Sequence, residues 1–197
     1  MAGRPREFDT DGACEIAMHL FWSNGYDATS LSDLLSAMEL SKSSFYQTFK
    51  SKLSLFELCL ERYREIIIST MNTGMANAPS AMAFIHFSLI DVANDTTDPL
   101  GRRGCLMMNT AAEFGQRDPG IARCVEAGIQ ATRDVFLTAV TNAQTAGDIN
   151  STARAEVLAD YLITVLSGLK TQVKAGASHK KITNIADVSV AALQRIT

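Results

Sequence analysis

One short stretch of the chain, residues 41–52, carries side chains suited to holding phosphate groups. It reads SKSSFYQTFKSK, with three lysines, several hydroxyl side chains and no aspartate or glutamate. Lysine and hydroxyl groups bind phosphate oxygens, and a helix N-terminus adds backbone N–H donors. Gln47 and Ser44 could also reach base edges in the major groove of DNA, which admits a helix. These residue types indicate a DNA-reading segment; the alternative is an amphipathic hairpin whose lysines are merely solvated.

Two short helices joined by a tight turn would position these side chains. Ser30 is suited to cap the first helix, with Asp33 near the free N–H groups of its first turn. Ser41 is suited to cap the second helix, in which Phe45 and Phe49 lie four residues apart on the side expected to be buried. The first helix has one apolar face at helical spacing, formed by Leu31, Leu34, Leu35 and Met38.

The sequence S-K-S-S-F-Y-Q-T-F-x-S-K, placed after T-S-L-S-D-L-L, closely resembles the helix-turn-helix of the tetracycline-repressor (TetR) family. The surrounding order is similar as well, with a basic tail, an amphipathic helix, Gly25-Tyr26, and a long helix after Lys52. The resemblance covers residues 4–60. It implies an all-α protein of about nine helices, with an N-terminal three-helix DNA-binding domain and a C-terminal helical domain.

The resemblance also implies a division of labour along the chain. Residues 1–52 would bind DNA, and residues 53–197 would bind a ligand and form the dimer, with 53–73 as the connecting helix. The implied partners are a palindromic operator in double-stranded DNA and a second copy of the chain, because a dyad lets two half-sites be read together. The implied DNA contacts are Thr29, Ser30, Lys42, Ser43, Ser44, Tyr46, Gln47, Lys50 and Lys52. Arg4 and Arg6 are either a disordered end or an arm that touches DNA.

One residue departs from the family pattern. Members usually have glycine in the turn between the two short helices, where this chain has Glu39. Glycine adopts a positive φ without a steric penalty, whereas glutamate does not. We therefore expect the turn to be re-formed or strained at this position.

The amino-acid composition and net charge limit the fold class of the protein and the way in which it could bind DNA. Hydrophobic residues make up 47% of the 197-residue chain, and only four prolines and 12 glycines occur, which favours a helical core. The formal net charge is −3, and residues 1–52 hold five basic and seven acidic side chains, so DNA affinity must come from a local patch. We expect a cytoplasmic protein without a membrane span, with no cofactor and no metal. The four cysteines are far apart in sequence and are expected to be separate reduced thiols.

The rest of the chain reads as further helices. Helices are expected at 9–24, 79–94, 104–115 and 118–146, with a loop at 95–103. The helix at 79–94 is apolar nearly all round and should be interior. The last two helices, 151–175 and 180–196, each carry an apolar stripe that would close their own core or pack against a second copy.

A regulator of this class needs a switch, so an apolar cavity for a small-molecule inducer is expected in the C-terminal domain. Cys105 follows Arg102 and Arg103 near the start of a helix, a setting that favours thiolate. The R-G-C-L pattern resembles a TetR subgroup that contains repressors of electrophile-detoxifying genes, so Cys105 is either an electrophile sensor or a structural thiol. The candidate ligand residues, each alternatively ordinary core, are Phe84, Phe87, Cys105, Met107, Met108, Phe114 and Tyr161.

Two other functions compete with this interpretation. A helical small-molecule-binding protein without DNA activity would also fit the net acidity and Glu39 in the turn. An enzyme is disfavoured, because the sequence lacks a Ser/His/Asp arrangement, paired carboxylates in an apolar setting, and a glycine loop for phosphate. The sequence thus predicts a DNA-binding transcriptional regulator, a repressor, and assigns no catalytic residue.

Overall fold

The computed structural model describes residues 9–150 and 152–194, and every regular element in these ranges is a helix. This confirms the predicted all-α class and the expected number of helices. The proposed arm at Arg4 and Arg6 lies outside the described residues. The α-helices are α1 (Thr10–Asn24), α2 (Leu31–Ala37), α3 (Lys42–Phe49), α4 (Lys52–Asn77), α5 (Ala81–Ile90), α6 (Leu106–Phe114), α7 (Pro119–Ala146), α8 (Ala155–Lys174) and α9 (His179–Ala192).

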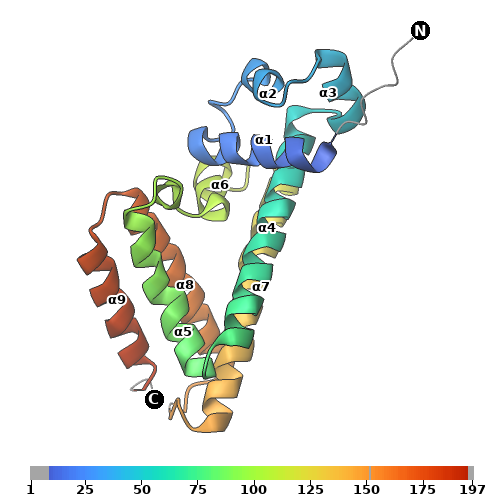
Figure 1. The fold of residues 1–197 in the computed structure, drawn as a ribbon. Coiled ribbons are helices and arrows are strands. Elements are labelled where there is room, and N and C mark those ends of the chain that lie inside the picture. The colour runs from blue at the N-terminus through green and yellow to red at the C-terminus, as the bar shows by residue number, and fades with distance from the viewer. Residues whose placement is uncertain (1–8, 151, 195–197) are drawn as a thin grey trace.

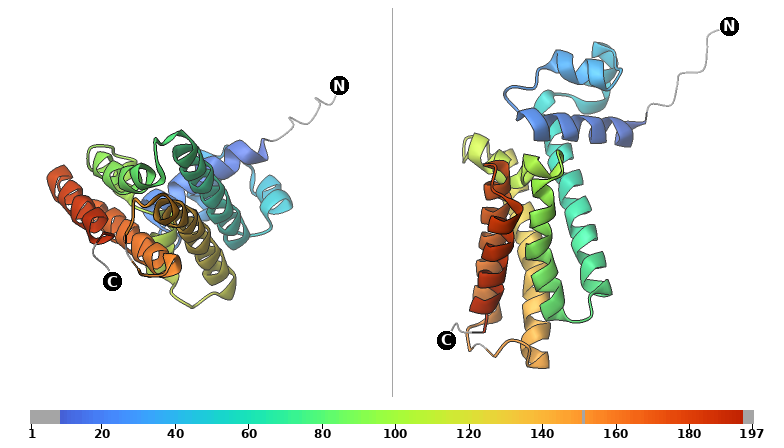
Figure 2. Two further views of the ribbon diagram at one scale, coloured as in Figure 1. Left: turned by 90° about the horizontal axis from the view of Figure 1, so that it is seen from below. Right: turned by 60° about the vertical axis from the view of Figure 1, so that its left-hand side comes forward.

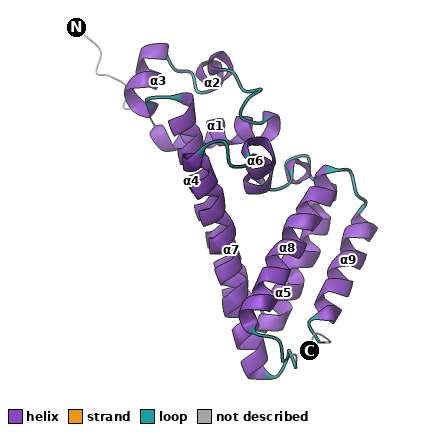
Figure 3. Cartoon of the chain, turned by 180° about the vertical axis from the view of Figure 1, so that it is seen from behind, coloured by secondary structure: helices purple, strands orange, loops and turns teal. Residues whose placement is uncertain are grey.

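The helices form a small head and a longer body (Figure 1). Helices α1, α2 and α3 cluster around the first turns of α4, which leaves the head and runs down the body beside α7. Helices α5 and α8 pack on α7, α9 packs on α5 and α8, and α6 lies beneath α1 (Figures 1 and 2). The view from behind shows helices joined by loops, with no strand among the described residues (Figure 3).

Side-chain caps explain where the helices begin. The Asp9 carboxylate accepts from the N–H of Gly12 at 3.0 Å, and Ser41 Oγ accepts from the N–H of Ser44 at 3.1 Å. Asp118 caps α7 in the same way, with Pro119 in the first turn of the helix. Each cap satisfies N–H groups that have no partner inside the helix, so these starts depend on local sequence.

The buried side chains form two cores. The first joins the head to α4, α6 and the start of α7, and it runs from Ala13 on α1 to Val125 on α7. The second lies between α5, the rest of α7, α8 and α9. The first core continues across residue 52, so the head is packed onto the body rather than hinged at that position.

The segment between α5 and α6 differs from the sequence prediction. The helix expected at 79–94 ends at Ile90, and the expected loop at 95–103 contains parts of two 3₁₀ helices, Asp91–Thr96 and Gly101–Arg103. The hydroxyl of Thr96 donates to the Ala93 carbonyl at 2.7 Å, which supports this tighter winding. Phe87 is 53% exposed, so one side of α5 faces solvent and the prediction of an interior helix was wrong for that side.

The turn between α2 and α3 adopts the conformation that glycine usually provides. Glu39 has φ 54°, and Leu40 closes the turn by donating its N–H to the Leu35 carbonyl at 2.9 Å. A second non-glycine residue, Lys50, has φ 66° at the end of α3, which the sequence did not indicate. The backbone keeps the turn geometry even though a side chain is present.

We expect Glu39→Gly to stabilise the protein by about 0.5–1 kcal/mol, because glycine removes the steric cost of a positive φ. Urea unfolding followed by circular dichroism would measure the change. Glu39→Ala is the matched control, since it removes the same charge but keeps the Cβ atom. Equal gains from both substitutions would show that charge, not backbone strain, is responsible.

Candidate DNA interface

Helix α3 is held to the head by two aromatic side chains. Phe45 is fully buried, Phe49 is 2% exposed, and their ring centroids lie 5.6 Å apart. Leu34 and Met38 of α2 are buried in the same core. Two phenylalanines four residues apart bring one face of α3 inward, so the remaining side chains must point to solvent.

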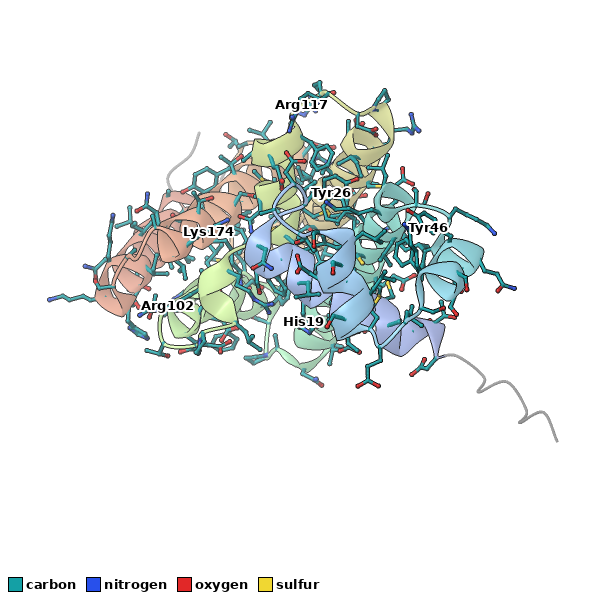
Figure 4. All side chains as sticks on the ribbon, turned by 90° about the horizontal axis from the view of Figure 1, so that it is seen from above. His19, Tyr26, Tyr46, Arg102, Arg117 and Lys174 are labelled. Atoms are coloured by element: carbon teal, nitrogen blue, oxygen red, sulfur yellow. The ribbon has the colours of Figure 1, made fainter. Side chains whose placement is uncertain are left out.

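The outward face of α3 is polar and carries no acid. Its exposed residues are Lys42, Ser43, Tyr46, Gln47 and Thr48, and Tyr46 is 44% exposed. Looking down on the head, Tyr46 lies on the α3 side of the molecule, far from Arg102 and Lys174 (Figure 4). This face is free of intramolecular packing and presents donors and acceptors together.

Three hydroxyls at the start of α3 interact with one another. Ser41 Oγ lies 2.8 Å from Ser44 Oγ and 3.3 Å from Ser43 Oγ. Ser44 is half-buried, whereas Ser43 is exposed. Ser44 keeps spare hydrogen-bonding capacity, since a hydroxyl has one donor and two acceptor sites.

The start of α2 is a reciprocal capping box. The hydroxyl of Ser30 donates to Asp33 Oδ2 at 2.7 Å, and the N–H of Ser30 donates to the same oxygen at 2.9 Å. These two bonds hold the pKa of the Asp33 carboxyl below its usual range. The predicted cap is confirmed, and Ser30 remains exposed beside α3.

Two expected DNA contacts are placed differently. Thr29 is fully buried, and its hydroxyl donates to the Gly25 carbonyl at 2.6 Å, so this side chain does not face a phosphate. Lys52 is half-buried, with Nζ 4.1 Å from the ring centroid of Tyr26. Both residues fasten the Gly25-Tyr26 turn to the head instead of extending from it.

Helix α6 of the body is hydrogen-bonded to the Gly25-Tyr26 turn. The Glu113 carboxylate accepts from the N–H groups of Tyr26 and Asp27, at 2.9 and 2.7 Å. Nearby, Trp22 Nε1 donates to the Gly104 carbonyl at 3.1 Å. The two ends of α6 are therefore attached to α1 and to the α1–α2 turn, which ties the head to the residues around Cys105.

A cavity of about 70 Å³ lies inside the body, between α4, α7, α8 and the beginning of α6. Its walls include the predicted ligand residues Cys105, Met107 and Met108. Gly128 makes room for Met107, because a Cβ atom at Gly128 would lie 2.8 Å from the Met107 methyl. A cavity of about 150 Å³ can hold benzene, so this smaller cavity suits a compact molecule unless the methionines move.

The other predicted ligand residues lie elsewhere. Phe84 and Phe87 line an open groove of about 680 Å³ on the other side of Lys170, which also lines the cavity. Phe114 packs against Tyr26 in the first core, with ring centroids 5.1 Å apart. Tyr161 donates to the Ser189 carbonyl at 3.3 Å and packs between α8 and α9. The structure thus places three of the seven candidates at the cavity, and the expectation of one shared pocket was wrong.

Cys105 occupies the N-cap position of α6 and is half-buried. Arg102 Nε donates to the Thr96 carbonyl at 2.8 Å, and the Arg103 guanidinium stacks 4.1 Å from the Trp22 ring. Both arginines therefore interact with groups other than the Cys105 thiol, whereas the sequence suggested that they would stabilise its thiolate form. Burial raises the pKa of Tyr63 well above its usual value, and a hydrogen bond to Cys105 adds to the shift.

Comparison with known proteins identifies the chain's family. A model of bacterial regulatory proteins of the tetR family matches residues 15–59, and a model of the tetracyclin repressor-like C-terminal domain matches residues 86–188. The chain belongs to the TetR family. As a TetR-family protein with an exposed α3 face, it is a DNA-binding transcriptional regulator.

Individual TetR relatives match along nearly the whole chain. The HTH-type transcriptional repressor ComR of Escherichia coli (strain K12) is 29% identical over 95% of this chain and 90% of its own length. The uncharacterized regulator YezE of Bacillus subtilis (strain 168) is 29% identical over 97% and 99%. A solved structure of the TetR-family regulator CifR, a cysteine mutant with 26-base-pair operator DNA, has a TM-score of 0.84 and 28% identity over 96% and 99%.

Several residues of this TetR protein that line the cavity or join the head to the body could not be predicted from the sequence. Glu113, Tyr63 and Lys170 carry no local motif, and only Gly128 offered a signal, because a glycine inside a long helix is unfavourable without a packing reason. In residues 9–150 and 152–194, no group of His, Cys, Asp and Glu side chains forms a metal site. None of the helices in these ranges combines the length and apolar character needed to cross a bilayer.

Proposed function

We propose that this protein is a cytoplasmic repressor that binds a palindromic operator as a homodimer and leaves it when a small molecule or electrophile reaches the body. The exposed, acid-free face of α3 carries this proposal. Relatives named as repressors, ComR and BdcR of Escherichia coli, support the repressor role. In this proposal residues 1–52 bind DNA, and residues 53–197 bind the inducer and form the dimer.

The DNA contacts are proposed for the outward residues of the head. Gln47 and Ser44 read base edges, and Lys42 and Ser30 hold phosphates at the starts of α3 and α2. Lys50 is exposed, and its Nζ donates to the Gln47 carbonyl at 2.9 Å, so it must release that bond to reach a phosphate. Ser43 and Tyr46, which are also exposed on α3, complete the proposed set of DNA-contacting residues.

The dimer is proposed to form through α8 and α9. Much of the two predicted stripes is buried inside one protomer, since Leu158 and Leu162 of α8 and Ile182 of α9 are fully buried. Ile185 of the α9 stripe, in contrast, is 36% exposed. On the outer faces, Val157 is 50% exposed and Val188 is 70% exposed. A second copy would cover these side chains, and light scattering should therefore report twice the mass of the chain.

We expect Lys42→Ala to weaken binding to all DNA sequences alike and to lower the slope of log affinity against log salt by about one unit. The reason is the loss of one phosphate contact. Fluorescence anisotropy at several salt concentrations measures the slope. Lys180→Ala on α9 is the control, because this exposed lysine lies in the body. If Lys42→Ala instead lost the ability to discriminate between bases at a single position of the site, Lys42 would be a base-reading residue.

Selection of bound DNA from a random pool tests the operator proposal directly. An enriched two-fold repeat of a short motif is the expected result, because two α3 helices would read two half-sites. A failure to enrich any sequence, together with tight binding of small apolar molecules, would support the alternative of a helical ligand-binding protein.

Cys105 is proposed as the site where an electrophile acts. The thiol lines the cavity and begins α6, whose two ends contact the head, so an adduct there would displace the contacts at Gly104 and Glu113. The R-G-C-L pattern supports the assignment to an electrophile-responsive subgroup. The competing role is a structural thiol that packs under α4.

N-ethylmaleimide should release wild-type protein from its operator and leave Cys105→Ser bound. The adduct is larger than the cavity, so it must push α6 aside. Anisotropy of labelled operator DNA measures release, and Cys124→Ser serves as the control for the other half-buried thiol. If wild type and Cys105→Ser are released to the same extent, Cys105 is not the sensor.

A further inference from the structure

Two cysteines that are 45 residues apart in sequence meet inside the head. Cys14 of α1 and Cys59 of α4 have their Sγ atoms 3.8 Å apart, and Cys59 Sγ also lies 3.5 Å from the Cys14 carbonyl. Cys14 is 9% exposed and Cys59 is fully buried. All four cysteines are free thiols, as the sequence predicts, but their spacing in the sequence did not indicate that these two would be in contact.

The two thiols have different chemical environments. A hydrogen bond from Cys59 lowers the pKa of Cys14, and Arg62 lowers it further, against burial, Asp11 and Glu15. The same hydrogen bond and burial raise the pKa of Cys59 far above its usual value. Cys14 is also the less buried of the two thiols. Because a thiolate is the reactive form, both observations favour Cys14 as the nucleophile and Cys59 as the thiol that resolves it.

We propose that Cys14 and Cys59 are an oxidative modification site, at which a hydroperoxide forms a reversible disulfide that lowers the affinity of the head for DNA. In the first step, the Cys14 thiolate attacks the terminal oxygen of the hydroperoxide, the O–O bond breaks, and Cys14 becomes a sulfenic acid. The leaving alkoxide, or hydroxide in the case of hydrogen peroxide, takes up the proton that the Cys14 thiol released and departs as an alcohol or water. In the second step, Cys59 sulfur attacks Cys14 sulfur, the new S–S bond replaces the S–O bond, and the hydroxyl leaves with the Cys59 proton as water.

The disulfide must change the packing of the head. The Sγ atoms have to approach from 3.8 Å to about 2.05 Å, the length of an S–S bond. Both thiols sit in the first core, together with Phe45 and Phe49, which hold α3. A close-packed core transmits such a movement, so α3 shifts relative to α4. The effect on DNA rests on the proposed α3 interface, whereas disulfide formation does not.

The Cys105→Ser/Cys124→Ser double variant tests the proposal, since it leaves Cys14 and Cys59 as the only two of the four cysteines. Under hydrogen peroxide, both thiols should disappear from a thiol titration and the mass of the monomer should fall by two hydrogen atoms. Affinity for DNA selected from a random pool should fall about tenfold, a usual size for coupling between sites. Dithiothreitol should restore both readings.

Further variants separate the possible failures. Adding Cys14→Ala or Cys59→Ala should leave one thiol and abolish the peroxide effect on DNA, with thermal unfolding used to confirm that each variant folds. Persistent thiols, a disulfide between two chains, or an intramolecular disulfide that leaves DNA affinity unchanged would each overturn the proposal. If the reduced double variant selects no DNA, the proposed α3 interface is contradicted. The thiol titration still decides whether the disulfide forms.

Discussion

Replacing Phe45 by alanine should unfold the DNA-binding head and abolish DNA binding. Phe45 is fully buried in the core beneath α3, in contact with Phe49. Removal of a buried phenylalanine ring costs about 3–5 kcal/mol, because apolar contacts are lost and a cavity remains. Typical domains have about 5–15 kcal/mol of total stability, so this loss is a large fraction. Urea unfolding and operator anisotropy measure the two effects.

Tyr46→Ala is the matched control for Phe45→Ala. The two residues are neighbours on α3, but Tyr46 is 44% exposed and points away from the core. Its removal should change stability by no more than about 0.5 kcal/mol, while it weakens DNA binding through the loss of a surface contact. A Phe45→Ala protein that unfolds at the wild-type urea concentration would contradict the assignment of Phe45 as the anchor of α3.

Glu113→Ala should loosen the attachment of the head to the body. The Glu113 carboxylate accepts from two backbone N–H groups of the α1–α2 turn, at Tyr26 and Asp27. Hydrogen bonds to charged groups contribute about 1.5–3 kcal/mol each, and the N–H of Tyr26 is left part-buried without this acceptor. We expect a loss of about 2 kcal/mol in total, because the bond to Asp27 is exposed.

Amide hydrogen exchange gives the local measure of this effect. The amides of Tyr26 and Asp27 should exchange faster in Glu113→Ala, and the release of operator DNA by N-ethylmaleimide should weaken, because α6 no longer pulls on the turn. Glu126→Ala, which removes an exposed carboxylate of α7, should change neither reading. Unchanged exchange at both amides in Glu113→Ala would remove α6 as the link between Cys105 and the head.

The size of the cavity limits the kind of inducer that the proposed function can involve. A volume of about 70 Å³ beside Cys105 is too small for most apolar ligands, and two methionines occupy the neighbouring wall. A reactive molecule gains a covalent bond and so does not need a large contact surface. This favours an electrophile over a bulky non-covalent inducer in the proposed function.

The sequence alone determined the features that depend on neighbouring residues. The predicted caps at Ser30 and Ser41 are correct because each side chain bonds to N–H groups within the first turn of its own helix. The burial of Phe45 and the exposure of α3's polar face follow from helical periodicity. At Glu39 the family's usual glycine led us to expect a turn that is either re-formed or strained, and the positive φ corresponds to the strained alternative.

Only the tertiary structure decided which distant residues meet. The sequence treats Cys14 and Cys59 as unrelated, yet the crossing of α1 and α4 brings their sulfurs to 3.8 Å. In the same way, Glu113 bonds to the backbone of Tyr26, which lies 87 residues earlier in the chain. Thr29, which the family resemblance implied as a DNA contact, is fully buried in the folded head. Helical spacing shows which face of a helix is apolar, but not what covers that face, because the partner is selected by long-range packing.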